Sequence, residues 1–285
     1  MNVIPNKKLS YIPPVTMDID SLEDLPFIPS KPLPSKSFAF LIVGQPGSGK
    51  TTLWNSLLLS HPTKKKPNTP KFLYKLFDHI YLISPSLQTL PLNKLNLNPD
   101  RMFNQYTDQL LEDILELEKD GENLNNLIII DDSVRDLTRS KVLEDILEEE
   151  MNAENLNNLI IIDDSVRDLT RSKVLCRTIL NRRHCTQNND EEGKAGLSIM
   201  ITSQKYNMVP MALRLNMSNV IVFRSENQRE LDTIKNELLG DLTKDQQNEL
   251  LKTAWKEPYD FLFIDNFKPK KERYFRNFDK IEIPE

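Results

Sequence analysis

The sequence is poor in cysteine and has no long apolar run, and each shortage excludes a class of protein. Its 285 residues include two cysteines, Cys176 and Cys185, which are too few for a disulfide framework and fit a reducing compartment. His184 adjoins Cys185 without a CxxC spacing, so we expect no thiolate metal site. No run of about 18 apolar residues occurs, so we expect no membrane span. The N-terminal MNVIPNKKLSYIPP also lacks the apolar core of a secretory signal.

The chain also lacks the excess of positive charge that is typical of many nucleic-acid-binding proteins. Its formal net charge is −5. Basic residues nevertheless gather in two short runs, Lys64–Lys66 and Lys268–Arg276, and the second run has interleaved aromatic residues. Either run can contact a phosphate backbone. Short charge runs are more often solvated surface, so the sequence leaves both interpretations open.

Apolar runs alternate with helical stretches along most of the chain. Residues 1–36 are rich in proline and are expected to form an extended arm. Residues 37–266 are expected to form one α/β domain with a mainly parallel sheet flanked by helices, because alternating strands and helices favour that fold. Residues 267–285 follow as a basic and aromatic tail. The expected strands lie at 38–43, 77–84, 197–202, 220–223 and 261–264 and at two LIII runs, and the expected helices lie at 105–119 and 230–255, after each LIII run, and after GQPGSGKTT as far as His61-Pro62.

A phosphate-binding loop is the clearest motif. The segment GQPGSGKT matches G-x-x-x-x-G-K-[ST] between an expected strand and an expected helix. Such a loop wraps backbone N–H groups around phosphates at a helix N-terminus. Lys50 is expected to reach the β- and γ-phosphates and Thr51 to hold Mg²⁺, so ATP and Mg²⁺ are the expected cofactors. The expected nucleotide-binding residues are Gly44, Gln45, Pro46, Gly47, Ser48, Gly49, Lys50, Thr51 and Thr52.

An acidic strand end, LIIIDD, occurs twice because the chain carries a tandem repeat. Residues 112–143 align without gaps on 144–175, and 28 of the 32 positions match. The first aspartate of such a pair is expected to hold Mg²⁺, and the second to orient or deprotonate the attacking water. A helix cap is a compatible second role for the pair. The candidates are Asp163 with Asp164 and, in the first copy, Asp131 with Asp132.

The second copy is the favoured acidic site, because it runs without an insertion into the segments that follow. The first copy keeps the direct link to the upstream helix at 105–119, so both copies stay candidates. The unused strand is too apolar for water. We expect it to join a sheet edge or to pack under its own helix, 134–150, unless the repeat is an accident of sequencing with no selected place in the fold.

Downstream, Gln204 ends the run LSIMITSQ. A polar residue at that strand end can sense the γ-phosphate and position water, although such a glutamine alone is more often a turn residue.

The order of these motifs resembles that of a known family. GQPGSGKTT, YLISPS, LIIIDD, NRRH, SIMITSQKYNMVPMALRLN, VIVFR and the segment from YDFLFIDNF onward are similar to the DNA-packaging ATPases of large DNA viruses, the poxvirus-type branch of the FtsK–HerA P-loop superfamily. The resemblance covers about residues 37–280. It implies an additional-strand, RecA-like P-loop fold. The tandem repeat departs from this family, in which one acidic strand is expected.

By position, the resemblance implies roles for Lys50, Thr51, one aspartate pair and the sensor Gln204. It also makes Arg214 and Arg183 candidate arginine fingers that reach a neighbouring subunit's nucleotide. The alternative for Arg214 is a salt bridge, and the alternative for Arg183 is a basic helix end that suits the helix dipole.

The family likeness implies an ATP-driven translocase that packages double-stranded viral DNA into a capsid. A ring of five or six copies, contacts with capsid proteins, and a location at the assembly site in the host cytoplasm or in the virion follow from it. Two other functions stay open: a FtsK–HerA-like DNA pump without a capsid, and a nucleotide-binding scaffold whose site the repeat has damaged. A small-molecule P-loop kinase is less favoured, because no arginine-rich lid follows the sheet.

Overall fold

The computed structural model describes residues 3–4, 32–34, 38–84, 95, 97–104, 125–131, 157–164 and 196–284. Several expectations fall outside these residues, namely Asp132, Arg183, Cys176, His184, Cys185, most of the arm at 1–36, the helix at 105–119 and the segments after both LIII runs. The chain divides into two compact units. The phosphate-loop unit consists of Met1–Pro34, Phe40–Lys75 and Ser203–Glu285, and the acidic-strand unit consists of Ser35–Ala39 and Leu76–Thr202.

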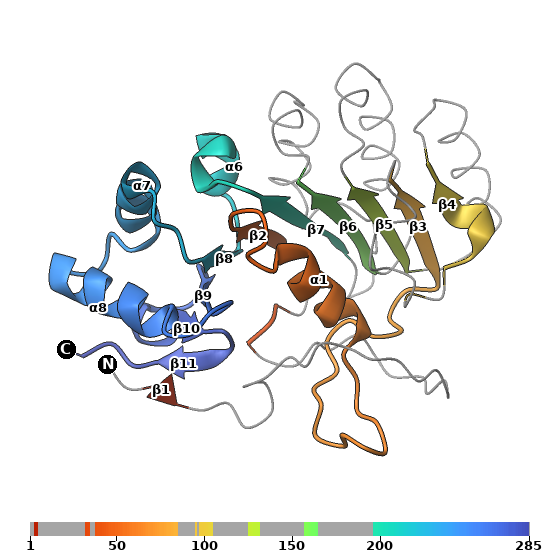
Figure 1. The fold of residues 1–285 in the computed structure, drawn as a ribbon, viewed down its shortest axis with the longest axis horizontal. Helices are drawn as coiled ribbons and strands as arrows, with labels where there is room; N and C mark the ends of the chain where they lie inside the picture. The colour runs from red at the N-terminus through yellow and green to blue at the C-terminus, as the bar shows by residue number, and fades with distance from the viewer. Residues whose placement is uncertain are drawn as a thin grey trace, which may run out of the picture. The chain divides into compact units, whose positions relative to one another are not determined.

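The phosphate-loop unit combines a parallel strand pair with an antiparallel extension, in the order β1-β11-β10-β9-β8-β2 (Figure 1). Strands β2 and β8 are parallel, and the pairs β8–β9, β9–β10, β10–β11 and β11–β1 are all antiparallel. The bounds are β1 (Val3–Ile4), β2 (Ala39–Val43), β8 (Asn219–Phe223), β9 (Phe261–Asp265), β10 (Tyr274–Arg276) and β11 (Asp279–Ile281). Strands β2 and β8 are buried along their whole length, as their continuous apolar sequences predict.

Aromatic rings fill much of the interior of this unit. The ring of Phe263 lies 5.9 Å from that of Phe40 and 5.8 Å from that of Phe278, and Phe278 lies 5.7 Å from Phe72. All four side chains are almost completely buried. Separations of this size suit the offset and edge-on contacts that aromatic quadrupoles prefer, so these rings join β2, β9, the β10–β11 turn and the segment after α1 into one core.

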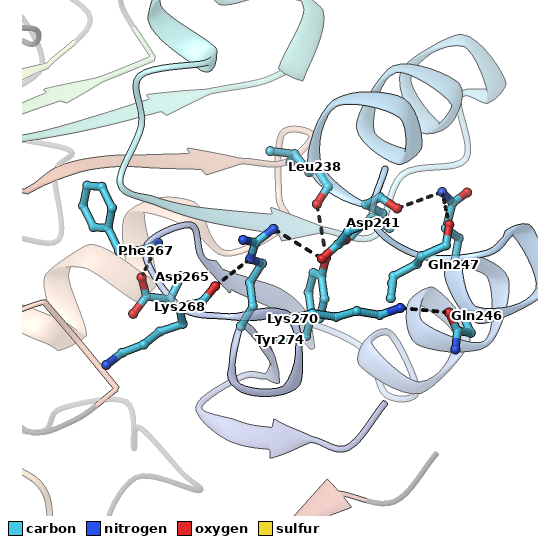
Figure 2. A network of polar contacts seen from close by, with 12 residues as sticks. Leu238, Asp241, Gln246, Gln247, Asp265, Phe267, Lys268, Lys270 and Tyr274 are labelled. Carbon is cyan, nitrogen blue, oxygen red and sulfur yellow. Dashed lines mark hydrogen bonds and ion pairs between the residues drawn. The ribbon is translucent and has the colours of Figure 1, made fainter. Parts of the chain in front are cut away.

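The segment that the sequence suggests is a tail, 267–285, extends the sheet as β10 and β11. Tyr274 is buried, and burial raises the pKa of its phenol. Its hydroxyl donates to Asp241 Oδ1 at 2.5 Å (Figure 2). Phe278 and Ile281 are buried as well. The segment is therefore ordered by contacts with residues distant in the sequence, which its short local pattern does not reveal.

Helices α1, α7 and α8 belong to the same unit. Helix α1 ends just before His61-Pro62, as expected. The single helix expected at 230–255 is two helices, because Thr243 starts a new helix through a reciprocal capping box with Gln246. The helical bounds are α1 (Lys50–Leu59), α6 (Met211–Arg214), α7 (Gln228–Leu238) and α8 (Lys244–Ala254), with 3₁₀ turns η3 (Tyr206–Met208) and η4 (Lys270–Glu272). Within the described part of the chain, no helix has the length and apolar character to cross a membrane.

The acidic-strand unit carries a parallel sheet in the order β7-β6-β5-β3-β4 (Figure 1). Every adjacent pair in it is parallel, which confirms the mainly parallel α/β fold. The bounds are β3 (His79–Ile83), η1 (Pro99–Arg101), β4 (Met102–Phe103), β5 (Asn126–Asp131), β6 (Asn157–Asp163) and β7 (Gly196–Ser203).

The two copies of the repeat lie side by side as β5 and β6, with Leu127 paired to Leu159 and Asp131 to Asp163. Strand β5 also pairs with β3 on its other side. The expectation that the spare strand joins a sheet edge is therefore wrong, because β5 lies inside the sheet. In this position both of its hydrogen-bonding edges are paired and its isoleucines are buried, and the sheet gains no exposed edge that could pair with another chain.

Candidate nucleotide-binding site

The phosphate loop connects β2 to α1 and lies close to the end of β7. The Gly44 N–H donates to Ser203 O at 3.0 Å, and the Ser48 N–H donates to Gln45 O at 3.0 Å. The first bond anchors the start of the loop, and the second closes a turn within it. Gln45, Pro46 and Gly47 are exposed, so the tip of the loop faces solvent, where a ligand can reach it.

Two glycines of the loop adopt conformations that side chains disfavour. Gly47 has φ 79° and Gly49 has φ 101°, and the missing Cβ makes this left-handed backbone inexpensive. Gly49 is also the N-cap residue of α1, with no capping side chain. The loop thus reaches the N-terminus of a ten-residue helix, where the helix dipole favours an anion.

Lys50 lies across the loop rather than in bulk solvent. Its side chain is 5% exposed, and its Nζ donates to Gly44 O at 2.9 Å. The ammonium is therefore held at the loop. When a nucleotide binds there, the ammonium can exchange its hydrogen bond to the carbonyl for one to a phosphate oxygen. Thr51 is half-buried and Thr52 is exposed. The expected phosphate-binding residues are contiguous in this geometry.

At the end of β6, Asp163 and Asp164 share a hydroxyl on β7. Thr202 Oγ1 donates to Asp163 Oδ1 at 2.5 Å and accepts from the Asp164 N–H at 2.9 Å. Asp163 is buried, whereas Asp164 is half-buried. Asp164 has φ 48°, a left-handed conformation that aspartate tolerates better than most residues. The pair therefore leaves the strand with Asp163 held against β7 and the chain turned sharply at Asp164.

The first copy has a different partner. Asp131 is buried and accepts a hydrogen bond from Ser84 Oγ at 2.8 Å. Ser84 follows β3, on the side of the sheet away from β7. Identical LIIID sequences therefore lie in different environments, because each strand's neighbours differ.

Gln204 directly follows β7 and is exposed. The segment after it is fixed by Glu230 of α7, which is buried and accepts from the Tyr206 N–H and from Ser225 Oγ, the latter at 2.7 Å. Glu230 is not among the residues that the sequence motifs indicate. The spacing of Asn227 and Glu230, whose N–H donates to Asn227 Oδ1 at 3.2 Å, is a helix-start signal. That signal predicts the cap but not the bond to Tyr206.

Arg214 forms the salt bridge that the sequence left open as an alternative to an arginine finger. Its Nε and Nη2 donate to the two carboxylate oxygens of Glu237, and its Nη1 donates to Val209 O at 2.7 Å. The guanidinium also lies over the Tyr206 ring, 4.9 Å from its centroid. The hydrogen bond with Arg214 holds the pKa of Glu237 below its ordinary value, and the same bond raises the pKa of Arg214. In this arrangement the guanidinium stabilises the interior of its own unit, and its role as an arginine finger stays a prediction.

Two residues that the sequence predicts to bind magnesium, Thr51 of α1 and Asp163 of β6, carry oxygen donors of a suitable kind. Mg²⁺ prefers hard oxygen ligands and usually takes one or two from the protein, with the remainder from phosphates and water. The Thr51 hydroxyl and the Asp163 carboxylate are donors of this kind. Among the described residues there is no group of three or more His, Cys, Asp or Glu side chains that could hold a metal.

The fold is similar to that of viral DNA-packaging ATPases. No protein-family model matches the chain, and no curated protein matches it. Among solved structures, the DNA-packaging ATPase B204 from Sulfolobus turreted icosahedral virus superposes with a TM-score of 0.51 at 15% identity, covering 88% of this chain and 98% of that one. The genome-packaging NTPase B204 from Sulfolobus turreted icosahedral virus 2, in complex with ATP-gammaS, also gives 0.51 at 15% identity and covers 87% and 98%.

These likenesses show that the chain has the fold of a P-loop ATPase, which confirms the expected fold class. They also agree with the resemblance to viral DNA-packaging ATPases that the sequence motifs suggest.

Proposed function

We propose that this protein is a DNA-translocating ATPase. The observation that carries the proposal is the geometry of the phosphate loop. Lys50 donates a hydrogen bond across the loop to Gly44 O, and two glycines with left-handed backbone conformations lead into α1. This geometry is built to hold a triphosphate. The similarity of the fold to that of B204, a DNA-packaging ATPase, supports DNA as the substrate on which the enzyme acts.

Each residue then has a role in hydrolysis. Lys50 neutralises charge on the β- and γ-phosphates, and Thr51 and Asp163 supply oxygen ligands for Mg²⁺. Magnesium, when bound, stabilises charge on the phosphate oxygens. Asp164 orients or deprotonates the attacking water. Gln204, which is exposed directly after β7, senses the γ-phosphate.

We assign the acidic role to the second copy of the repeat. Its support is the bond from Thr202 of β7 to Asp163, since β7 is also the strand whose Ser203 carbonyl accepts the first N–H of the phosphate loop. Asp131 instead faces Ser84. Asp163→Asn should abolish ATP turnover while Asp131→Asn, the matched control with the same sequence context, largely preserves it. The reverse result would transfer the role to the first copy.

The direct test is ATP turnover with and without double-stranded DNA, for the wild type and Lys50→Ala. DNA should stimulate the wild type, and the variant should be inactive with and without it. An ATP turnover rate that is the same with and without DNA would favour a small-molecule kinase or another P-loop enzyme. ATP binding without any turnover would favour a nucleotide-binding scaffold. Full hydrolysis by Lys50→Ala would remove the basis of the proposal.

The finer form of the proposal is packaging of a viral genome. It includes a homo-oligomeric ring of five or six copies, contact with capsid proteins, and action at the assembly site in the host cytoplasm. Its support is the motif order together with the fold shared with B204. Binding of the purified protein to procapsids would support packaging, whereas DNA translocation without capsid binding would favour a FtsK–HerA-like pump.

A further inference from the structure

An exposed tyrosine borders the phosphate loop. Tyr259 precedes β9 and its side chain is 72% exposed. A Cβ built on Gly49 would lie 3.7 Å from Tyr259 Cδ1 and 3.9 Å from Phe223 Cε1. A side chain at position 49 would therefore meet the phenol ring in van der Waals contact, so the ring lies beside the point at which the loop enters α1, and most of the ring's surface faces solvent.

The backbone of Tyr259 is in an unfavourable conformation. Its φ is 67°, and a positive φ is rare for a residue with a bulky side chain. Burial does not offset this strain, because the side chain is exposed. Strain of this kind persists only when the surroundings enforce it, and it concentrates at ligand-binding positions.

The enforcing contacts come from Asp260. Its Oδ2 accepts the Glu257 N–H at 2.8 Å, and its own N–H donates to Glu257 O at 3.2 Å, so the two residues close the turn that contains Tyr259. Arg276 pairs with the same carboxylate at 2.9 and 2.7 Å, and Asn277 Nδ2 donates to its other oxygen at 2.8 Å. A buried, fully engaged aspartate thus holds the tyrosine rigidly beside the loop.

We propose that Tyr259 is the stacking surface for the base of the nucleotide whose phosphates the loop binds. This inference rests on the proposed nucleotide-binding function and adds the part of the ligand beyond its phosphates. A rigid aromatic face loses little entropy on binding, and every nucleobase has a π-face that can stack on it. Stacking alone favours a ligand that carries a base over one that has only phosphates, and it discriminates only weakly between different bases.

The test separates the base from the phosphates. Binding of ATP and of inorganic tripolyphosphate is measured by calorimetry for the wild type, Tyr259→Phe, Tyr259→Ala and Tyr259→Gly. We expect Tyr259→Ala and Tyr259→Gly to weaken ATP binding by about five- to 150-fold, the range for aromatic–base stacking. Tripolyphosphate binding should be unchanged, and Tyr259→Phe should bind ATP as the wild type does.

Two controls keep the result interpretable. Tyr259→Gly relieves the positive φ, so this variant should unfold at the same temperature as the wild type or higher, and its loss of affinity cannot be a folding defect. Phe267→Ala removes another exposed aromatic ring at the opposite end of β9 and should leave ATP binding unchanged.

Unchanged ATP affinity in Tyr259→Ala would overturn the inference while leaving nucleotide binding intact. An equal loss of ATP and tripolyphosphate affinity would also overturn it, because the ring would then only support the loop. A wild-type protein that binds neither ligand would instead refute the nucleotide-binding function, and the inference with it.

Discussion

Replacing Arg214 should destabilise the phosphate-loop unit, because this residue is one half of a nearly buried ion pair. The side chains of Arg214 and Glu237 are 10% and 16% exposed. Removing one partner of a buried pair typically costs about 3–5 kcal/mol, since the other charge stays in the interior without compensation. The slight exposure of both groups places Arg214→Met near the lower end, so we expect a loss of about 3 kcal/mol in the free energy of unfolding.

The assay is urea unfolding of the wild type, Arg214→Met, Glu237→Leu and the double variant. The double variant should be more stable than either single variant, because it leaves no buried charge unpaired. Thermal unfolding should show Arg214→Met melting about 6–12 °C lower than the wild type, given the usual relation between stability and midpoint for domains of this size.

The pH dependence has a definite sign. The folded-state pKa of Glu237 lies below its ordinary value of 4.5, first because of the hydrogen bond with Arg214. A lowered pKa contributes stability above the ordinary value, and this stability is lost as the pH falls through the folded-state value. The difference in stability between the wild type and Arg214→Met should therefore shrink below pH 4.5. If Arg214→Met unfolds like the wild type but abolishes turnover in assemblies mixed with wild-type subunits, the salt-bridge assignment is wrong and the arginine-finger role returns.

Three further predictions concern other parts of the chain. Replacing Lys64–Lys66 with alanine should flatten the salt dependence of DNA binding by about 0.9 in log–log slope for each lysine that contacts a phosphate, and an unchanged slope would identify these exposed residues as solvated loop. Deleting 112–143 should leave a folded, active ATPase, because β6 has the same NLIIID sequence as β5 and can pair with β3 in its place. A deletion variant that circular dichroism and turnover show to be insoluble or inactive would contradict this. Thr243→Ala should lower the free energy of unfolding by about 1 kcal/mol through the lost capping box, measured by urea unfolding against Thr253→Ala as a control inside the same helix.

Much of the fold could be predicted from local patterns. The apolar runs predict β2, β8 and β9 at or near their observed bounds, and the loop sequence predicts the start of α1. These predictions are correct because both signals, a continuous apolar run and a phosphate-loop motif, consist of consecutive residues. The break between α7 and α8 was missed, although Thr243 and Gln246 carry a recognisable capping signal.

The partners of the polar residues could not be predicted in the same way. Arg214 and Glu237 are 23 residues apart, and the Thr202 hydroxyl lies 39 residues from Asp163. Nothing in either local sequence specifies these pairs. The same holds for Tyr259, whose significance depends on its backbone angle and on its distance from Gly49.

The sequence by itself determined that this chain has a phosphate loop after a buried strand and two identical acidic strands, because both features depend on adjacent residues. Only the tertiary structure decided that β5 lies between β3 and β6, that the final segment completes the sheet, and that Arg214 is held by Glu237. The reason is physical: identical strands such as β5 and β6 differ only in their neighbours, and neighbours in a sheet are brought together by the packing of the whole unit.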